Sequence, residues 1–194
     1  PPPVARPTVV ASGVAVGPDR IITALSRCAD PKVGARAARV VKADDASGLM
    51  LLDAPGLGAK PLPMGAGAAA DGVIVALYAA ARAGVNNAAP PAEVMAATGE
   101  LLASPARALA PLQGEAPGGA VFDRNGGFVG LVGAAKAPTR IAGVVPQTAW
   151  PVVEARKVTA FLEANGVRSE PAPGAGQTRS TADIAAAARA SIYP

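Results

Sequence analysis

Short apolar runs separated by turn residues occupy most of the chain. In the first half, the runs at residues 8–16 and 20–25 flank a Gly-Pro-Asp turn, and those at residues 37–43 and 49–53 flank a polar turn. Each pair predicts a β-hairpin, because turn residues between β-branched or aliphatic runs favour antiparallel pairing. Residues 72–79 predict one further buried strand.

The second half continues in the same style. The runs at residues 120–124 and 127–133 flank an Asn-Gly dipeptide, which is the strongest short-range hairpin signal. Residues 141–146 predict another strand. Residues 92–103 fit either a pair of strands or a short helix, because their apolar positions match both periods.

Near the C-terminus the pattern changes to that of helices. Residues 149–165 place apolar side chains on one helical face, with Thr148 available as N-cap and Gly166 after the end. Ser180 and Asp183 form a capping-box-like start for a short alanine-rich tail helix. A helix this short is marginal alone, so we expect it to dock on the rest of the chain.

Many short strands in two halves, closed by one helix, predict an all-β chain built from a pair of β-barrels. The expected parts are an extended lead-in at 1–7, a first β-barrel at 8–79, an inter-barrel connection at 80–91, a second β-barrel with its closing helix at 92–166, a linker at 167–179 and a C-terminal tail helix at 180–194.

Composition narrows the classes of function. Apolar residues make up 51% of the 194 residues and aromatic residues only 3%, so the core must be built mainly from aliphatic side chains. The net charge of +4 comes from scattered lysines and arginines, which is typical of a solvated surface and does not favour a nucleic-acid partner. The sequence contains no run of about 18 apolar residues, so it predicts no membrane-spanning helix.

The single cysteine and the chain ends add two expectations. Cys28 has no cysteine in the chain to pair with, so it is either a buried thiol or pairs with a cysteine elsewhere. One cysteine without histidine does not predict a metal site, and nothing predicts a cofactor. The chain opens on Pro1 rather than methionine, which we interpret as a processed or fragmentary chain compatible with a removed secretion signal.

Three segments resemble trypsin-like (chymotrypsin-fold) serine proteases. Residues 11–28 resemble their first hairpin, in which two aliphatic residues and Thr-Ala precede the catalytic histidine and a cysteine. Residues 45–52 resemble the segment that carries the aspartate. Residues 115–133 resemble the nucleophile loop and the hairpin after it, and are the most specific of the three. The closing helix resembles that of the bacterial periplasmic high-temperature-requirement proteases.

The resemblance implies two antiparallel six-stranded β-barrels of the chymotrypsin type, closed by a C-terminal helix, in a periplasmic or extracellular protein. It also places the catalytic triad on residues that differ from the family. Ser26 falls at the histidine position, or Leu25 or Arg27 if the gap is placed differently, and Gly48 falls at the aspartate position. None of these side chains acts as the base or its orienting carboxylate.

The nucleophile position falls on Pro117 and one oxyanion position on Glu115. Proline removes both the hydroxyl and a backbone N–H that would donate to the oxyanion. A glutamate brings negative charge to a site that must bind negative charge. Gly118 and Gly119 are expected to keep the tight turn of this loop.

These substitutions predict a chain that is not an enzyme. We expect a pseudoprotease, an inactive serine protease homologue that acts as a protein-binding or scaffold subunit of a larger complex. Its partners would be proteins, including members of a membrane complex. The alternatives are one domain of a longer multidomain protein whose activity lies elsewhere, or an enzyme of unrecognised chemistry using Glu100, Glu115 or Asp123.

Overall fold

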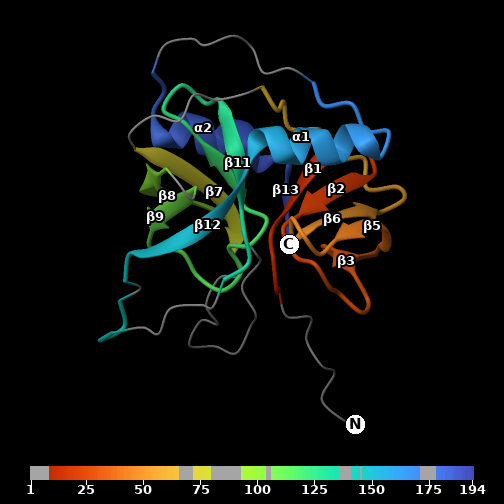
Figure 1. Ribbon diagram of the computed structural model, residues 1–194, viewed down its shortest axis with the longest axis horizontal. Coiled ribbons are helices and arrows are strands. Elements are labelled where there is room, and N and C mark those ends of the chain that lie inside the picture. The colour runs from red at the N-terminus through yellow and green to blue at the C-terminus, as the bar shows by residue number, and fades with distance from the viewer. Residues whose placement is uncertain are drawn as a thin grey trace.

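The computed structural model places two β-sheet bodies side by side, with both helices packed along one side of them (Figure 1). It describes residues 9–65, 72–79, 93–103, 106–135, 141–144, 146–170 and 178–194. The expected lead-in at 1–7 and the inter-barrel connection at 80–91 lie outside these residues, and so does most of the expected linker.

The N-terminal half forms a five-stranded antiparallel sheet in the order β13-β1-β2-β6-β5. Both hairpins expected from the sequence are confirmed, because β1 pairs with β2 and β5 pairs with β6. The strands are β1 (Gly13–Gly17), β2 (Arg20–Thr23), β5 (Arg39–Asp44), β6 (Leu49–Asp53) and β13 (Ile192–Tyr193). A small separate ribbon joins β3 (Lys32–Val33) to β4 (Arg36–Ala37).

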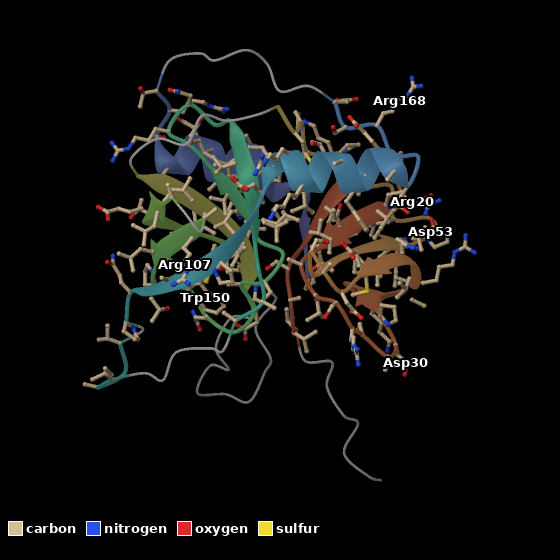
Figure 2. All side chains as sticks on the ribbon, viewed as in Figure 1. Arg20, Asp30, Asp53, Arg107, Trp150 and Arg168 are labelled. Carbon is tan, nitrogen blue, oxygen red and sulfur yellow. The ribbon has the colours of Figure 1, made fainter. Side chains whose placement is uncertain are left out.

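One buried carboxylate holds three of these strands in register. Arg20 and Arg39 lie directly opposite Asp53 on its two sides. The Asp53 carboxylate, which is 9% exposed, accepts from Arg39 Nε at 2.8 Å and lies 3.4 Å from Arg20 Nε. Figure 2 shows Arg20 and Asp53 at the outer end of this sheet. A one-residue slip of β2 or β5 would leave this charge unpaired, so the pair specifies the register.

The C-terminal half forms a closed six-stranded barrel in the order β10-β11-β12-β9-β8-β7. The expected Asn-Gly hairpin is confirmed as β10 paired with β11. The strands are β7 (Val73–Ala79), β8 (Glu93–Leu102), β9 (Arg107–Ala110), β10 (Ala120–Phe122), β11 (Phe128–Val132) and β12 (Thr148–Glu154).

Trp150 fills the interior of this barrel at 1% exposure (Figure 2). It lies opposite Ala108 on β9 and packs in one cluster with Ala110, Ala116 and several valines. One indole occupies the space that several aliphatic side chains would otherwise fill, so alanine suits the neighbouring positions. A chain with few aromatic residues still closes a well-packed barrel in this way.

The structure corrects the expected pair of six-stranded barrels. Only the C-terminal half closes; the N-terminal sheet is open in the described residues, and its end strands are β13 and β5. Residues 72–79 were assigned to the first barrel, but β7 pairs with β8 and β10 in the closed barrel. Residues 92–103 contain one long strand, β8, and the expected strand at 141–146 is reduced to a single bridge between Ile141 and Val144.

The closing helix begins later than the sequence predicts. Residues 148–154 form β12, which pairs with β9 and β11, and α1 (Ala155–Ala164) starts only after Glu154. Thr148 is therefore a strand residue and not the N-cap. The β-branched and aromatic residues before Ala155 complete the barrel ladder, and this tertiary pairing outweighs the helical period. Helix α1 packs on β11 and β12 of the barrel and on β6 of the open sheet.

The tail helix is confirmed as α2 (Thr181–Arg189), and the Ser180 hydroxyl accepts the Asp183 N–H as expected. Ile184 and Ala188 are buried, and α2 packs on β7 and β8. The tail then returns as β13 and pairs with β1, with Tyr193 opposite Gly13. The C-terminal segment thus belongs to both halves, because its helix covers the barrel and its strand extends the open sheet.

No helix in the described ranges has the length and apolar character needed to cross a bilayer.

Candidate functional site

The loop at residues 115–119, between β9 and β10, is the centre of the resemblance. Ala116, Pro117, Gly118 and Gly119 are all buried. The Gly118 N–H donates to Val132 O at 2.7 Å, and the Gly119 N–H donates to Ala116 O at 2.8 Å. Pro117 has no N–H to offer. The backbone donors of residues 117–119 are therefore either missing or bonded within the barrel.

This loop docks on the start of β1 and the end of β2. The Ser12 N–H donates to Pro117 O at 2.8 Å, and the Ser12 hydroxyl donates to Glu115 O at 2.8 Å. Thr23 Oγ1 in turn donates to Ser12 O at 2.6 Å. We call these three hydrogen bonds the Ser12 clasp: the two that Ser12 donates join the two halves, and the one from Thr23 holds Ser12 in place.

Gly118 is required for this docking. Its φ of +84° lies in the left-handed region, and an added Cβ would overlap Ser12 O and Thr23 Oγ1. Only a residue without a side chain allows the two backbones to approach this closely. The expectation that Gly118 preserves a tight turn agrees with this geometry.

The expected histidine and aspartate positions lie on neighbouring segments of the N-terminal half. Ser26 is half-buried, three residues after Thr23 at the end of β2. Gly48 has a φ of +70° in the turn between β5 and β6. An exposed ion pair of 3.6 Å between Arg27 and Asp45 connects these segments. The end of β2 thus contacts both the 115–119 loop, through Thr23, and the β5–β6 turn, through Arg27.

Asp44, which precedes Gly48 in the β5–β6 turn, stabilises the turn itself. Asp44 accepts from the Ser47 hydroxyl and from the N–H groups of Ala46 and Ser47. The hydrogen bond from Ser47, followed by that from the Ala46 N–H, lowers the pKa of Asp44 below its ordinary value of 3.8. Ionised Asp44 therefore stabilises the β5–β6 turn.

The three carboxylates considered for other chemistry have separate surroundings. Asp123 is buried in the β10–β11 turn, where its Oδ1 accepts the N–H groups of Asn125 and Gly127. Glu115 is half-buried beside Pro117, and Glu100 is exposed on β8. Asp123 is thus committed to its turn. Across the described part of the chain, no three cysteine or acidic side chains gather as a metal site, and Cys28 is half-buried.

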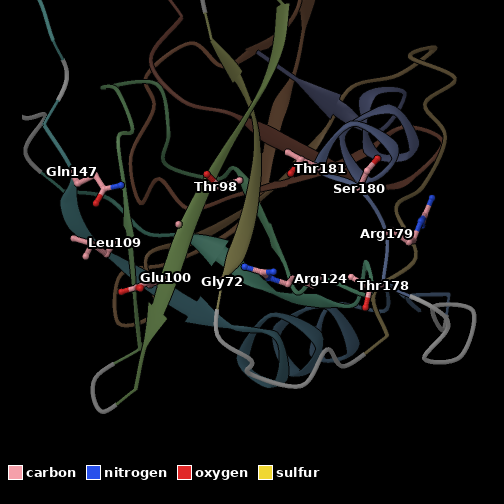
Figure 3. Close-up of a pocket in the computed structure, with 11 residues that line it drawn as sticks. Gly72, Thr98, Glu100, Leu109, Arg124, Gln147, Thr178, Arg179, Ser180 and Thr181 are labelled. Atoms are coloured by element: carbon pink, nitrogen blue, oxygen red, sulfur yellow. The ribbon is translucent and has the colours of Figure 1, made fainter.

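A groove of about 700 Å³ opens elsewhere, on the side of the barrel next to the start of α2 (Figure 3). It is lined by Thr98 and Glu100 of β8, by Gln147 before β12, and by Arg124 and Arg179. The sequence does not predict either arginine as a site residue. They come from a hairpin turn and from the tail, so no local spacing connects them.

Comparison with known proteins identifies the fold. No protein-family model and no curated protein sequence matches the chain. Among solved structures, it is similar to Rv3671c from M. tuberculosis H37Rv, a serine-to-alanine mutant in an inactive form, with a TM-score of 0.56 and 20% identity, covering 80% of this chain and 81% of that one. It is also similar to the HtrA-type protease AlgW with decapeptide, with a TM-score of 0.58 and 13% identity.

The AlgW match covers 83% of this chain and 53% of that one, so this chain spans about half of that protein. Identities this low establish the fold alone. The chain therefore has the trypsin-like fold of HtrA-type proteases, as the resemblance implied.

The same comparison corrects the expectation that the chain is not an enzyme. Both neighbours are serine proteases, which are enzymes, and the one described as inactive carries a mutation of its serine. Lost activity is therefore not a property of this fold. The 194 residues contain no histidine, so the imidazole of a Ser-His-Asp triad is not supplied by this chain.

Proposed function

We propose that this trypsin-like domain binds an extended segment of a protein partner along the open edge of β5 and serves as a scaffold subunit of a larger complex. The observation that carries the proposal is the state of that edge. Strand β5 ends the N-terminal sheet, and in the described residues it pairs only with β6. An unpaired edge presents a row of backbone donors and acceptors to a further strand.

The side chains of β5 supply apolar contact at this edge. Val40 and Val41 are each 42% exposed, and the pairing shifts by one residue between Val40 and Lys42. Such a bulge, together with the flanking charges of Arg39 and Lys42, discourages indiscriminate edge-to-edge association. Both valines remain accessible to a partner segment whose side chains fit this edge.

The opposite edge of the same sheet already binds an added strand of this chain. There the chain's own tail strand β13 adds to β1, with Ile192 opposite Val14. The sheet thus already accepts a short added strand at one end. The AlgW neighbour is described with a decapeptide, and a peptide of that kind suits recognition by strand addition.

The 115–119 loop is held at the junction of the two halves. Its backbone is buried and bonded to Ser12, so we place the binding surface at β5 rather than at this loop. The partner we propose is a protein, including a member of a membrane complex, rather than a nucleic acid, and the domain itself does not insert into a membrane. By resemblance, we propose a periplasmic or extracellular location.

Affinity purification of the tagged chain from its source, with quantitative mass spectrometry, tests the proposal. The variant Val40→Glu/Val41→Glu places charge on the edge while leaving the buried face of β6 intact. Met95→Glu/Leu102→Glu is the matched control, since these side chains are 45% and 40% exposed on β8 of the barrel.

We expect a stoichiometric protein partner with the wild-type chain and with the β8 control, and its loss with the β5 variant. A partner that remains on the β5 variant would contradict the proposed edge. A wild-type chain that purifies alone would contradict the scaffold role.

A further inference from the structure

The groove beside α2 brings together two arginines that are far apart in the sequence. The Arg179 N–H donates to Arg124 O at 2.9 Å, so the backbones of the β10–β11 turn and the tail are tied at this point. Figure 3 shows the Arg124 side chain extending towards Gly72 and β8, while Arg179 lies on the side of α2. Two segments therefore contribute arginines to the lining of the groove, Arg124 on the side of β8 and Arg179 on the side of α2.

Arg124 is presented from a rigid turn. The neighbouring Asp123 is buried, and its Oδ1 accepts from Asn125 N at 2.9 Å and from Gly127 N at 2.8 Å. These bonds fix the backbone on both sides of Arg124. Because the backbone of the turn is already ordered, a ligand bound by Arg124 does not have to order it.

Each arginine side chain lies against a glycine. A Cβ at Gly72 would come within 2.6 Å of an Arg124 terminal nitrogen, and one at Gly126 within 3.2 Å of Arg179 Nη1. Gly72 and Gly126 both have positive φ, at +76° and +81°. The absence of side chains at these two positions leaves room for the guanidinium groups along the groove wall.

Neither guanidinium forms an ion pair with any residue that the structure describes. The carboxylates around them are engaged or distant: Asp123 caps its turn, and Asp183 accepts from the Ser180 hydroxyl at 2.7 Å. Glu100 lines the groove from β8, and its side chain points away from Arg124 in Figure 3. The Arg124 end of the groove is thus basic, and the Glu100 end is acidic.

We propose that this groove binds an acidic peptide segment of a protein, with carboxylates at the arginine end. Guanidinium groups bind carboxylates through two parallel hydrogen bonds. The hydroxyls of Thr98 and Thr178, which line the same groove, offer further donors. Because the groove is open to water, a single carboxylate gains little there, and a segment that carries several is favoured. Glu100 disfavours acidic residues at the other end.

Fluorescence anisotropy with a labelled octapeptide of alternating glutamate and serine tests the site. We expect the wild-type chain to bind this probe, and the matching lysine–serine octapeptide to bind at least about 10-fold more weakly. Arg124→Met should weaken binding of the glutamate probe about 5-fold, and Arg124→Met/Arg179→Met about 10-fold or more. Glu100→Gln should tighten it about 2-fold.

Lys157→Met/Arg168→Met is the matched control, because it removes the same charge from exposed positions outside the groove. We expect it to change the affinity less than about 2-fold at 0.15 M salt. An equal loss of affinity in this control, an unchanged affinity in the double arginine variant, or no binding to the wild type would each overturn the proposal. Unchanged thermal unfolding of the variants shows that the fold is retained.

This inference is independent of the proposed function at β5. The Val40→Glu/Val41→Glu variant should bind the glutamate probe like the wild type, and the double arginine variant should keep any partner held at β5. Failure at one site is therefore distinguishable from failure at the other.

Discussion

The backbone N–H of Ser12 donates a hydrogen bond of 2.8 Å to the carbonyl of Pro117, across the junction of the open sheet and the closed barrel. This bond connects the residue before β1 to the buried 115–119 loop of the barrel. With the Ser12 hydroxyl on Glu115 O and Thr23 on Ser12 O, it makes the 115–119 loop part of the junction. The stability of this junction can be tested residue by residue.

Gly118→Ala should destabilise the protein strongly, because the new Cβ overlaps Ser12 O and also takes a positive φ. Gly48→Ala is the control, since Gly48 has a φ of +70° with no atom near its missing Cβ. We expect Gly48→Ala to lower the free energy of unfolding by about 1–2 kcal/mol because of its positive φ alone. Gly118→Ala should lower it by about 1–3 kcal/mol more because of the steric overlap. Urea unfolding measures both. Equal losses would show that the loop does not dock closely on Ser12.

Two threonine-to-valine variants should differ in their effect on the stability of the protein. Thr23 is buried and its hydroxyl donates to Ser12 O, so Thr23→Val should cost about 1–2 kcal/mol. Thr148 Oγ1 is buried without a hydrogen-bond partner among the described residues, so Thr148→Val should be neutral or stabilise the protein by up to about 1 kcal/mol. Thermal unfolding of the two variants measures both changes in stability. A larger loss of stability for Thr148→Val than for Thr23→Val would contradict the proposed role of the Ser12 clasp.

The tail should be an integral part of the fold. Ile184 of α2 is 2% exposed in the core that joins both halves, and Ile184→Ala should cost about 2–4 kcal/mol. Ile141→Ala makes the same chemical change at 70% exposure and should stay within about 0.5 kcal/mol. The midpoints of denaturant unfolding compare the stabilities of the two variants. A loss at Ile184 no greater than that at Ile141 would show that the tail is docked only loosely.

Acid should weaken the β5–β6 turn through Asp44. Its folded-state pKa is depressed by Ser47 and the Ala46 N–H, so its stabilisation is complete above the unfolded value of 3.8 and is lost as pH falls through the lower folded value. Asp44→Ala should therefore destabilise the protein at pH 7 and progressively less below pH 3.8. Urea midpoints at pH 7 and at acid pH measure this, with exposed Asp30→Ala as the control. A deficit that stays constant down to the most acid pH would contradict the role of ionised Asp44.

Local signals in the sequence were enough to predict the hairpins and the tail helix. The Gly-Pro-Asp and Asn-Gly turns and the Ser180 cap each act within a few residues, where sequence carries the information. The start of α1 and the strand β13 were not predictable in this way. Residues 148–154 pair on both sides within the barrel, and β13 pairs with β1 from the other end of the chain. Such long-range pairing overrides local preference.

The site was predictable in part. The resemblance predicts a functional loop at residues 115–119, and in the structure this loop lies against Thr23 at the end of β2. A closed first barrel is not seen in the described residues, where β7 joins the C-terminal barrel and β5 forms an edge of the N-terminal sheet. The groove lined by Arg124 and Arg179 could not be predicted from the sequence, because these residues lie far apart in the chain and come together only in the folded structure. The expected exclusion of enzymes was wrong because the solved structures that share this fold are proteases.

Hydrogen–deuterium exchange of the chain with and without its co-purified partner tests whether β5 is the binding edge. We expect the backbone amides of residues 39–44 to become protected in the complex, because a partner strand would pair with the free edge of β5. Amides of the opposite edge, which β13 already covers, should exchange as before. Unchanged exchange in β5 while the partner remains bound would contradict the claim that this edge is the binding site.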